Sequence, residues 1–235
     1  MCERNMGRGE IAKGEYYHIF NRGVEKRRIF LDDRDRWRFM TLLCVFQGEA
    51  IVPNIRRAIT LVQHSMLDDE VVQRCLIHRV VTLLGFCLMP NHFHLILRSE
   101  TANGISRYMQ RLGNAYTKYF NMRNERTGHL FGSRFHFVRV DRDEYFSYLS
   151  AYVHMNPREL ESWRGREDSY PWSSFQDYLA GNRWGLFLDT SVILAQFKDS
   201  ADYHSFVKSC DIKSAFPDDH RFDRIGLAQN QHVQH

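Results

Sequence analysis

Two adjacent apolar segments near the middle of the chain constrain its fold most. Residues 80–89 form a continuous apolar run with β-branched members, long enough for a buried strand. Pro90-Asn91 interrupts this run, and residues 92–97 then alternate in character along the chain. Two such runs joined by so short a break are typical of an antiparallel hairpin. We therefore expect a β-hairpin whose first strand is buried.

The rest of the chain alternates strand and helix patterns. Further strands are expected at 15–20 and 135–140, helices at 32–46, 105–122 and 144–156, and shorter helical segments within 48–79 and at 191–197 and 201–208. This order favours an α+β fold in which helices pack on a sheet. We divide the chain into a main domain, 1–180, which contains the helical insert 48–79, and a C-terminal helical extension with a polar tail, 181–235.

The composition excludes several classes of protein. The chain is 43% hydrophobic and 26% charged, which is typical of a globular domain rather than a disordered one. No apolar run approaches the roughly 18 residues of a membrane span, and no secretory signal is visible. The five cysteines are odd in number and form no CxxC pair, which argues against a disulfide framework or a thiolate zinc site. We expect a cytoplasmic protein with no membrane partner.

Positive charge is concentrated in one stretch, although the net charge of the chain is only +4. Residues 107–142 contain eight basic side chains against two acidic ones, with seven aromatic residues among them. On an ideal helix, Arg107, Arg111, Asn114 and Lys118 form a narrow stripe opposite the apolar face. Cations that neutralise phosphates, together with rings that stack on bases, are typical of single-strand nucleic-acid binding. The alternative is a solvated helix face beside a core strand.

Two histidines stand two positions apart on the second strand of the expected hairpin. Because side chains alternate along a strand, His92 and His94 leave the same face, whereas Phe93 and Leu95 take the other. Two imidazoles on one face at this separation can share one divalent metal ion. The alternative is a pair of half-buried strand histidines with no ligand.

The helix expected at 144–156 carries a row of polar groups on one face. Tyr145, Tyr148 and Tyr152 lie at positions i, i+3 and i+7, and Asn156 follows one turn after Tyr152. A phenol is a poor nucleophile until its target is polarised or its proton is removed. A metal ion beside it, held by two histidines and a neutral oxygen, would draw charge from a phosphodiester. The alternative is a tyrosine stripe used for packing and an asparagine that ends the helix.

Several motifs, taken in order, resemble a known family. They are the segments 17–23 (YHIFNRG), 87–97 (CLMPNHFHLIL), 109–113 (MQRLG), 119–121 (YFN), 128–131 (GHLF), 134–135 (RF), 152–157 (YVHMNP) and 170–174 (YPWSS). Together they resemble the single-tyrosine HUH transposases, and most closely the branch of REP-associated tyrosine transposases (RAYT). The resemblance extends into the C-terminal region through residues 188–190, 196–197, 203 and 206–207.

This resemblance implies a fold and an activity. The fold would be a ferredoxin-like antiparallel sheet flanked by helices, the HUH single-tyrosine nuclease and transposase fold, with a C-terminal helical extension. The protein would be a DNA transposase or nickase that cleaves and rejoins single-stranded, hairpin-bearing DNA through a 5′-phosphotyrosine intermediate. Its partners would be REP-like palindromic elements, and it would be cytoplasmic and associated with the nucleoid. Relatives include monomers and dimers, so the oligomeric state stays open.

The resemblance also assigns residues. By position, Tyr152 matches the nucleophile, and His92, His94 and Asn156 match the ligands of Mg²⁺ or Mn²⁺. We expect the helix that carries Tyr152 to fold back over the histidine pair. The basic residues expected to contact DNA are Arg107, Arg111, Lys118, Arg134 and Arg139.

Three alternatives stay open. The first is a domesticated protein that binds nucleic-acid hairpins without cutting them. The second is a small-molecule metallohydrolase that uses His92 and His94, although no HExxH motif or comparable acidic residue accompanies the pair. The third concerns the nucleophile, for which Tyr148 is the second candidate. The chain also departs from the family in its long 48–79 segment and in His136, which stands where a lysine is expected.

Overall fold

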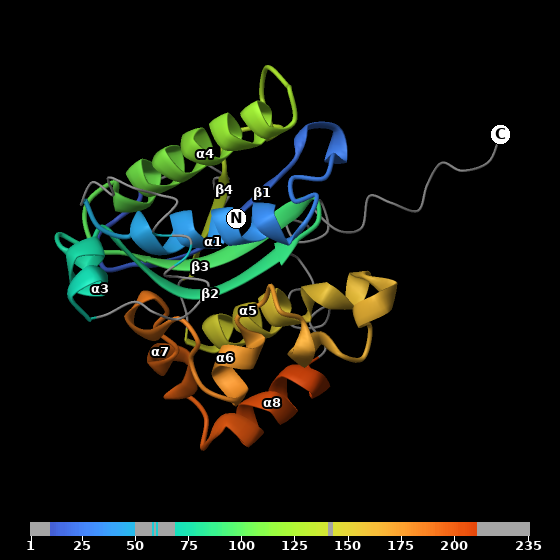
Figure 1. Cartoon of the computed structure of the whole chain (residues 1–235). Helices are drawn as coiled ribbons and strands as arrows, with labels where there is room; N and C mark the ends of the chain where they lie inside the picture. The colour runs from blue at the N-terminus through green and yellow to red at the C-terminus, as the bar shows by residue number, and fades with distance from the viewer. Residues whose placement is uncertain (1–9, 50–57, 59, 61–68, 141–142, 211–235) are drawn as a thin grey trace, which may run out of the picture.

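The structure is a computed structural model that describes residues 10–49, 58, 60, 69–140 and 143–210. An antiparallel sheet of four strands lies at its centre, in the order β2-β3-β1-β4 (Figure 1). The strands are β1 (Tyr16–Arg22), β2 (Val81–Met89), β3 (His92–Ser99) and β4 (His136–Val140). All four coincide with the strands that the sequence predicts, to within two residues at either end.

The connections between these strands give the fold its type. Helix α1 (Asp33–Val45) follows β1, the tight hairpin joins β2 to β3, and α4 (Gly104–Arg123) connects β3 to β4. The order β-α-β-β-α-β, with β1 and β3 as the central strands, is the ferredoxin-like arrangement. The fold class expected from the sequence is therefore confirmed.

Both faces of the sheet are covered by helices. Figure 1 shows α1 and α4 on one face and α5 (Asp143–Met155) on the other. All nine residues of β2 are buried, because the strand is covered from both sides and needs apolar side chains on each. Strand β3 alternates instead: Phe93 packs against Phe39 of α1, with ring centroids 5.1 Å apart, while His92 and His94 face α5.

The C-terminal helices add a layer beyond α5. Helices α6 (Phe175–Leu179), α7 (Ser191–Leu194) and α8 (Ser200–Ser209) lie on this side of the sheet (Figure 1). His154 of α5 bonds the hydroxyl of Tyr203 in α8, at 2.6 Å, and Ser174 beside α6, at 2.8 Å. The sequence predicts α7 and α8 but not α6. Short 3₁₀ turns complete the described chain: η1 (Val24–Lys26), η2 (Asn156–Glu159), η3 (Glu161–Trp163), η4 (Glu167–Ser169) and η5 (Gly185–Phe187).

Within the predicted insert 48–79, the structure describes α3 (Asp69–Leu76) and a few flanking residues. The rest of that insert, residues 141–142 and the tail from 211 onward lie outside the described residues. In the part of the chain that the structure describes, no helix has both the length and the apolar character needed to cross a membrane.

The start of α1 is tied to the end of α4. The Asp32 side chain caps α1 by accepting a hydrogen bond of 3.1 Å from the backbone N–H of Asp35. Arg123, in the last turn of α4, pairs with both Asp32 and Asp35. These contacts join the two helices that cover one face of the sheet.

Candidate functional site

The two histidines of β3 lie together on the face of the sheet that α5 covers. His92 is 3% exposed and His94 is fully buried, and their ring centroids are 5.1 Å apart with the rings nearly perpendicular. The common orientation expected from strand alternation is therefore present. Phe93, between them, points to the opposite face and packs in the core.

Helix α5 brings Tyr152 to this pair. The ring of Tyr152 meets the ring of His94 edge to face, with 5.3 Å between centroids. His18 of β1 lies close to both, 5.1 Å from the His94 ring and 5.9 Å from the Tyr152 ring. The α5 helix thus folds back over the histidines, as the sequence analysis expects. Asn156 follows directly, at the start of η2, and is 5% exposed.

Hydrogen bonds orient His92 and Asn156 toward each other. The Nδ1 of His92 bonds Oδ1 of Asn91 at 2.7 Å, and the amide nitrogen of Asn91 donates to the carbonyl of Lys26 at 3.3 Å. Asn91 therefore presents an acceptor, and His92 donates from Nδ1. The amide nitrogen of Asn156 donates to the carbonyl of Tyr152 at 2.9 Å, which leaves its Oδ1 3.4 Å from Nε2 of His92. Two lone-pair atoms thus face each other.

His94 uses its ring nitrogens in the same way. Its Nδ1 lies 2.9 Å from Nε2 of His18. Its Nε2 is buried and has no hydrogen-bond partner among the described residues. Each histidine of the pair therefore engages Nδ1 within the protein and leaves Nε2 for the site.

Burial keeps these imidazoles neutral. Burial, and then the positive charge of Arg22, lower the pKa of His92 to about 4. Burial alone lowers the pKa of His18 to about 3, and burial together with the neighbouring His92, His18 and Arg22 lowers the pKa of His94. A neutral imidazole offers a lone pair to a cation, so near pH 7 the rings are in the state that metal binding requires.

Tyr152 lies beside charged groups of opposite sign. Burial, reinforced by the negative charge of Glu159, raises the pKa of its phenol, and the side chain of Asn156 acts in the opposite direction. Arg22 ends β1 directly opposite His92 in the sheet. Its pKa is lowered by burial, while Glu159 and Tyr152 favour its charged form. The Nε of Arg22 is buried and makes no hydrogen bond within the described chain.

The donor set matches a divalent cation. His92 and His94 supply two imidazole nitrogens, which suit Zn²⁺ and other transition metals, and Asn156 supplies an amide oxygen, which suits Mg²⁺ or Mn²⁺. The lone pairs of His92 Nε2 and Asn156 Oδ1 face each other, and a cation between them would remove their repulsion. A cation would also give a partner to Nε2 of His94, which is buried and has none among the described residues. Among the described residues, no group of three or more His, Cys, Asp or Glu side chains forms another metal site.

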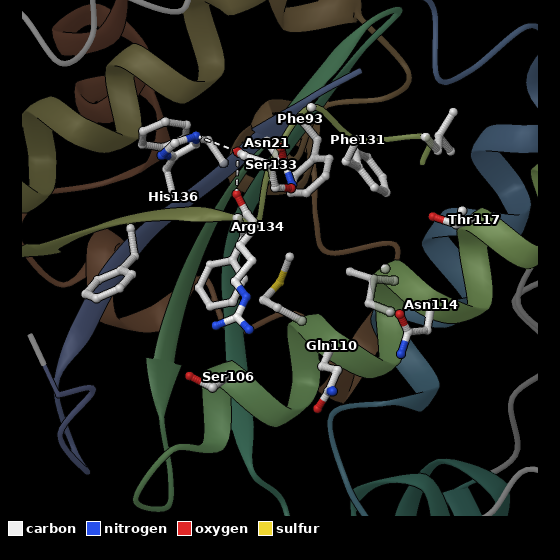
Figure 2. Close-up of a pocket in the computed structure, with 18 of the residues that line it drawn as sticks. Asn21, Phe93, Ser106, Gln110, Asn114, Thr117, Phe131, Ser133, Arg134 and His136 are labelled. Carbon is white, nitrogen blue, oxygen red and sulfur yellow. Dashed lines mark hydrogen bonds between the residues drawn. The ribbon is translucent and has the colours of Figure 1, made fainter. Parts of the chain in front are cut away.

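A separate pocket opens between α4 and the segment that leads into β4. Its volume is about 1530 Å³. Figure 2 shows Ser106, Gln110, Asn114 and Thr117 along one side of α4, with Asn21, Ser133 and Arg134 across the gap and the rings of Phe93 and Phe131 at its inner end. The lining combines uncharged hydrogen-bonding groups, exposed cations and aromatic rings, which is the chemistry that binds nucleic acid.

The five basic residues expected to contact DNA differ in what they contact within the protein. Lys118 and Arg134 line the pocket. Arg107 pairs with Glu49 at 3.0 Å, and Arg139 pairs with Glu15 at 2.9 Å. Arg111 donates to the carbonyl of Gly48 at 2.8 Å and stacks on the ring of Phe46.

Other candidates from the sequence lie elsewhere. Tyr148 packs against Phe206 of α8, with 5.4 Å between ring centroids. His154 is held in the core between α6 and α8. His136 bonds Ser133 at 2.9 Å and stacks on Phe20.

Sequence reasoning does not identify four residues of the site: His18, Arg22, Asn91 and Glu159. His18 and Arg22 belong to segment 17–23, and Asn91 to segment 87–97, both of which enter the family resemblance. The two segments therefore contain a usable signal, although the sequence does not say which of their residues reach the histidine pair.

Comparisons with known proteins found one matching family and a similar solved structure. Residues 50–156 match the family described as IS200-like transposases, a range that contains His92, His94, Tyr152 and Asn156. No curated protein matches the chain. One solved structure, of a REP-associated tyrosine transposase bound to a REP hairpin, is similar with a TM-score of 0.47 and 15% identity, over 75% of this chain and 84% of that one.

Proposed function

We propose that this chain, whose residues 50–156 match the IS200-like transposase family, is a metal-dependent enzyme that cuts and rejoins single-stranded, hairpin-bearing DNA. Tyr152 would be the nucleophile, and His92, His94 and Asn156 would hold Mg²⁺ or Mn²⁺. The observation that carries the proposal is the meeting of Tyr152 with the histidine pair, 5.3 Å between the rings of Tyr152 and His94.

The reaction is a transesterification. The phenol oxygen of Tyr152 forms a bond to phosphorus, the bond from phosphorus to the 3′ oxygen breaks, and the strand leaves with a 3′-hydroxyl while the 5′ phosphate stays on the tyrosine. The proton lost by the phenol is balanced by the proton gained at the 3′ oxygen. One phosphodiester replaces another, so no nucleotide cofactor is consumed and attack by a 3′-hydroxyl reverses the step.

The chain's own groups suit this step. Because the pKa of the Tyr152 phenol is raised, the side chain is protonated near neutral pH and must lose its proton during attack. Glu159 lies where its charge acts on both Tyr152 and Arg22. Arg22, with an unpartnered buried Nε, is suited to bind a phosphate oxygen as charge develops. When bound, the metal ion would stabilise negative charge on the phosphodiester oxygens.

We assign DNA binding to the pocket beside α4. Lys118 and Arg134 would neutralise phosphates, and the row of Ser106, Gln110, Asn114 and Thr117 would form hydrogen bonds with bases or sugars. Phe131 would stack on an unpaired base. Arg107, Arg111 and Arg139 already have partners within the protein, so we give them a smaller role.

The test is covalent capture of the intermediate. Purified protein is incubated with Mn²⁺ and a DNA hairpin that has single-stranded 5′ and 3′ flanks, each with its own label. The expected result is one labelled protein adduct with release of a 3′-hydroxyl strand, lost in Tyr152→Phe and kept in Tyr148→Phe. An adduct that persists in Tyr152→Phe contradicts the assignment. Hairpin binding with no adduct at any metal concentration supports a non-cutting binder instead.

A further inference from the structure

We propose that His18 is a positioning residue that orients His94 for metal binding. The inference rests on the proposed function, because it concerns the metal site. It goes beyond that function by assigning a role to a residue outside the ligand set. The evidence lies in the relation between two neighbouring strands, β1 and β3.

The two imidazoles are held in a fixed relation. His18 Nε2 and His94 Nδ1 are 2.9 Å apart, and both side chains are fully buried. In the β1–β3 register, His94 pairs with Phe20, which is two residues after His18 in β1. His18 and His94 are therefore diagonal neighbours on the same face of the sheet. Their ring planes are inclined by only 18° and their centroids are 5.1 Å apart, so the two rings meet edge to edge through this hydrogen bond. A side chain packed on all sides in this way cannot rotate freely.

The hydrogen bond decides which nitrogen of His94 is available. A neutral imidazole carries one N–H and one lone pair. For Nε2 of His94 to bind a cation, the proton must sit on Nδ1, and Nε2 of His18 is the acceptor within reach. When the proton of His18 sits on its own Nδ1, Nε2 of His18 accepts from His94 and holds the ring with its Nε2 facing the site. Groups of this kind behind a ligand commonly change metal affinity by about 10- to 100-fold.

The other ligand has the same arrangement. Asn91 accepts from Nδ1 of His92 at 2.7 Å, as His18 does from His94. Each histidine of the pair thus has one acceptor behind its Nδ1, and in both cases Nε2 faces the site. If Nε2 is the metal-binding atom of both histidines, each Nδ1 is expected to have its own acceptor, as found here.

The test replaces His18 with glutamine or asparagine, two residues that carry the same amide group on side chains of different length. The amide of His18→Gln extends to the position of the imidazole Nε2 and can still accept from His94. The amide of His18→Asn extends only as far as Nδ1 and cannot. Mn²⁺ affinity is measured without DNA, from the loss of the free-ion electron paramagnetic resonance signal. Thermal unfolding in EDTA reports whether each variant is folded.

The expected result is a Mn²⁺ Kd within about threefold of the wild type for His18→Gln and weaker by about 10- to 100-fold for His18→Asn. Equal affinity in wild type and His18→Asn, or equal weakening in both variants, overturns the inference while leaving the metal site in place. Absence of Mn²⁺ binding in the wild type overturns the proposed metal site itself. Should His18→Asn fail to fold, His18→Phe, which keeps the ring and removes the acceptor, takes its place with the same expectation.

Discussion

His94 and Tyr152 meet edge to face with 5.3 Å between their ring centroids, although 58 positions separate them in the chain. One is on a central strand and the other on a helix that covers that strand. The contact brings a candidate nucleophile to a candidate metal ligand without any partner chain.

Removing the metal is expected to destabilise the protein in a way that depends on the histidine pair. A ligand at 100 times its Kd stabilises the folded state by about 2.7 kcal/mol. For a chain of this size that corresponds to a rise in Tm of roughly 5–10 °C on adding Mn²⁺ and its loss in EDTA. His92→Ala is expected to abolish the shift, measured by differential scanning calorimetry. His154→Gln, a change at a histidine held away from the site, serves as the control and should keep the shift.

Arg22→Gln is expected to slow formation of the DNA adduct by about 100-fold, because a buried donor to the reacting phosphate is lost. Binding of the hairpin and of Mn²⁺ should change little. The matched control is Arg28→Gln, which removes an exposed charge shortly after η1. Single-turnover rates of adduct formation measure the effect, and equal rates in the two variants would refute the role given to Arg22.

Charge removal in the α4 pocket is expected to weaken hairpin binding and its dependence on salt. Lys118→Gln and Arg134→Gln should each lower the slope of log K against log salt by about 0.7 to 0.9, the value for one phosphate contact. Arg107→Gln, which breaks the pair with Glu49, should leave the slope nearly unchanged. Fluorescence anisotropy at four salt concentrations gives the slopes. A larger effect at Arg107 than at Lys118 would place the DNA on the other side of α4.

Stability is expected to fall in acid through Asp32. Its hydrogen bonds with Arg123 lower the pKa of the carboxyl from 3.8 to about 2 in the folded protein. A carboxyl whose folded pKa is depressed stabilises the protein above its unfolded pKa, and this stabilisation is lost as the pH falls from about 4 to 2. Because the side chain is 48% exposed, solvent screening keeps the effect below about 1 kcal/mol.

Asp32→Asn isolates this charge, because asparagine also caps a helix. The variant should be less stable than the wild type at pH 7 and approach it at pH 3, in urea unfolding followed by circular dichroism. A difference that does not change with pH would mean that the contact with Arg123 is not responsible.

Local patterns in the sequence account for most of the fold. The apolar run of β2, the break at Pro90-Asn91 and the alternation of β3 predict the hairpin, because these patterns reflect burial on two faces or on one. The same alternation puts His92 and His94 on one face. Helical spacing likewise places Tyr152 and Asn156 one turn apart. Helix α6 is not predicted, because its five residues span little more than one helical turn and show no repeating pattern.

The charge pattern is a weaker guide. The sequence correctly shows that residues 107–142 are rich in cations, but a count of charges does not show where their partners lie. Arg107, Arg123 and Arg139 pair with Glu49, Asp32 and Glu15, which come from distant parts of the chain. Only in the structure do Lys118 and Arg134 stand out as lining the pocket.

The sequence by itself determined which side chains share a strand face or a helix face, because that depends on backbone periods of 2 and 3.6 residues. That α5 covers the histidine face was expected only through the family resemblance, and the tertiary structure alone decided that His18 stands behind His94. Those contacts depend on strand register and on the packing of a helix against a sheet. Both are set by the sum of many distant side-chain contacts, and no local pattern records that sum.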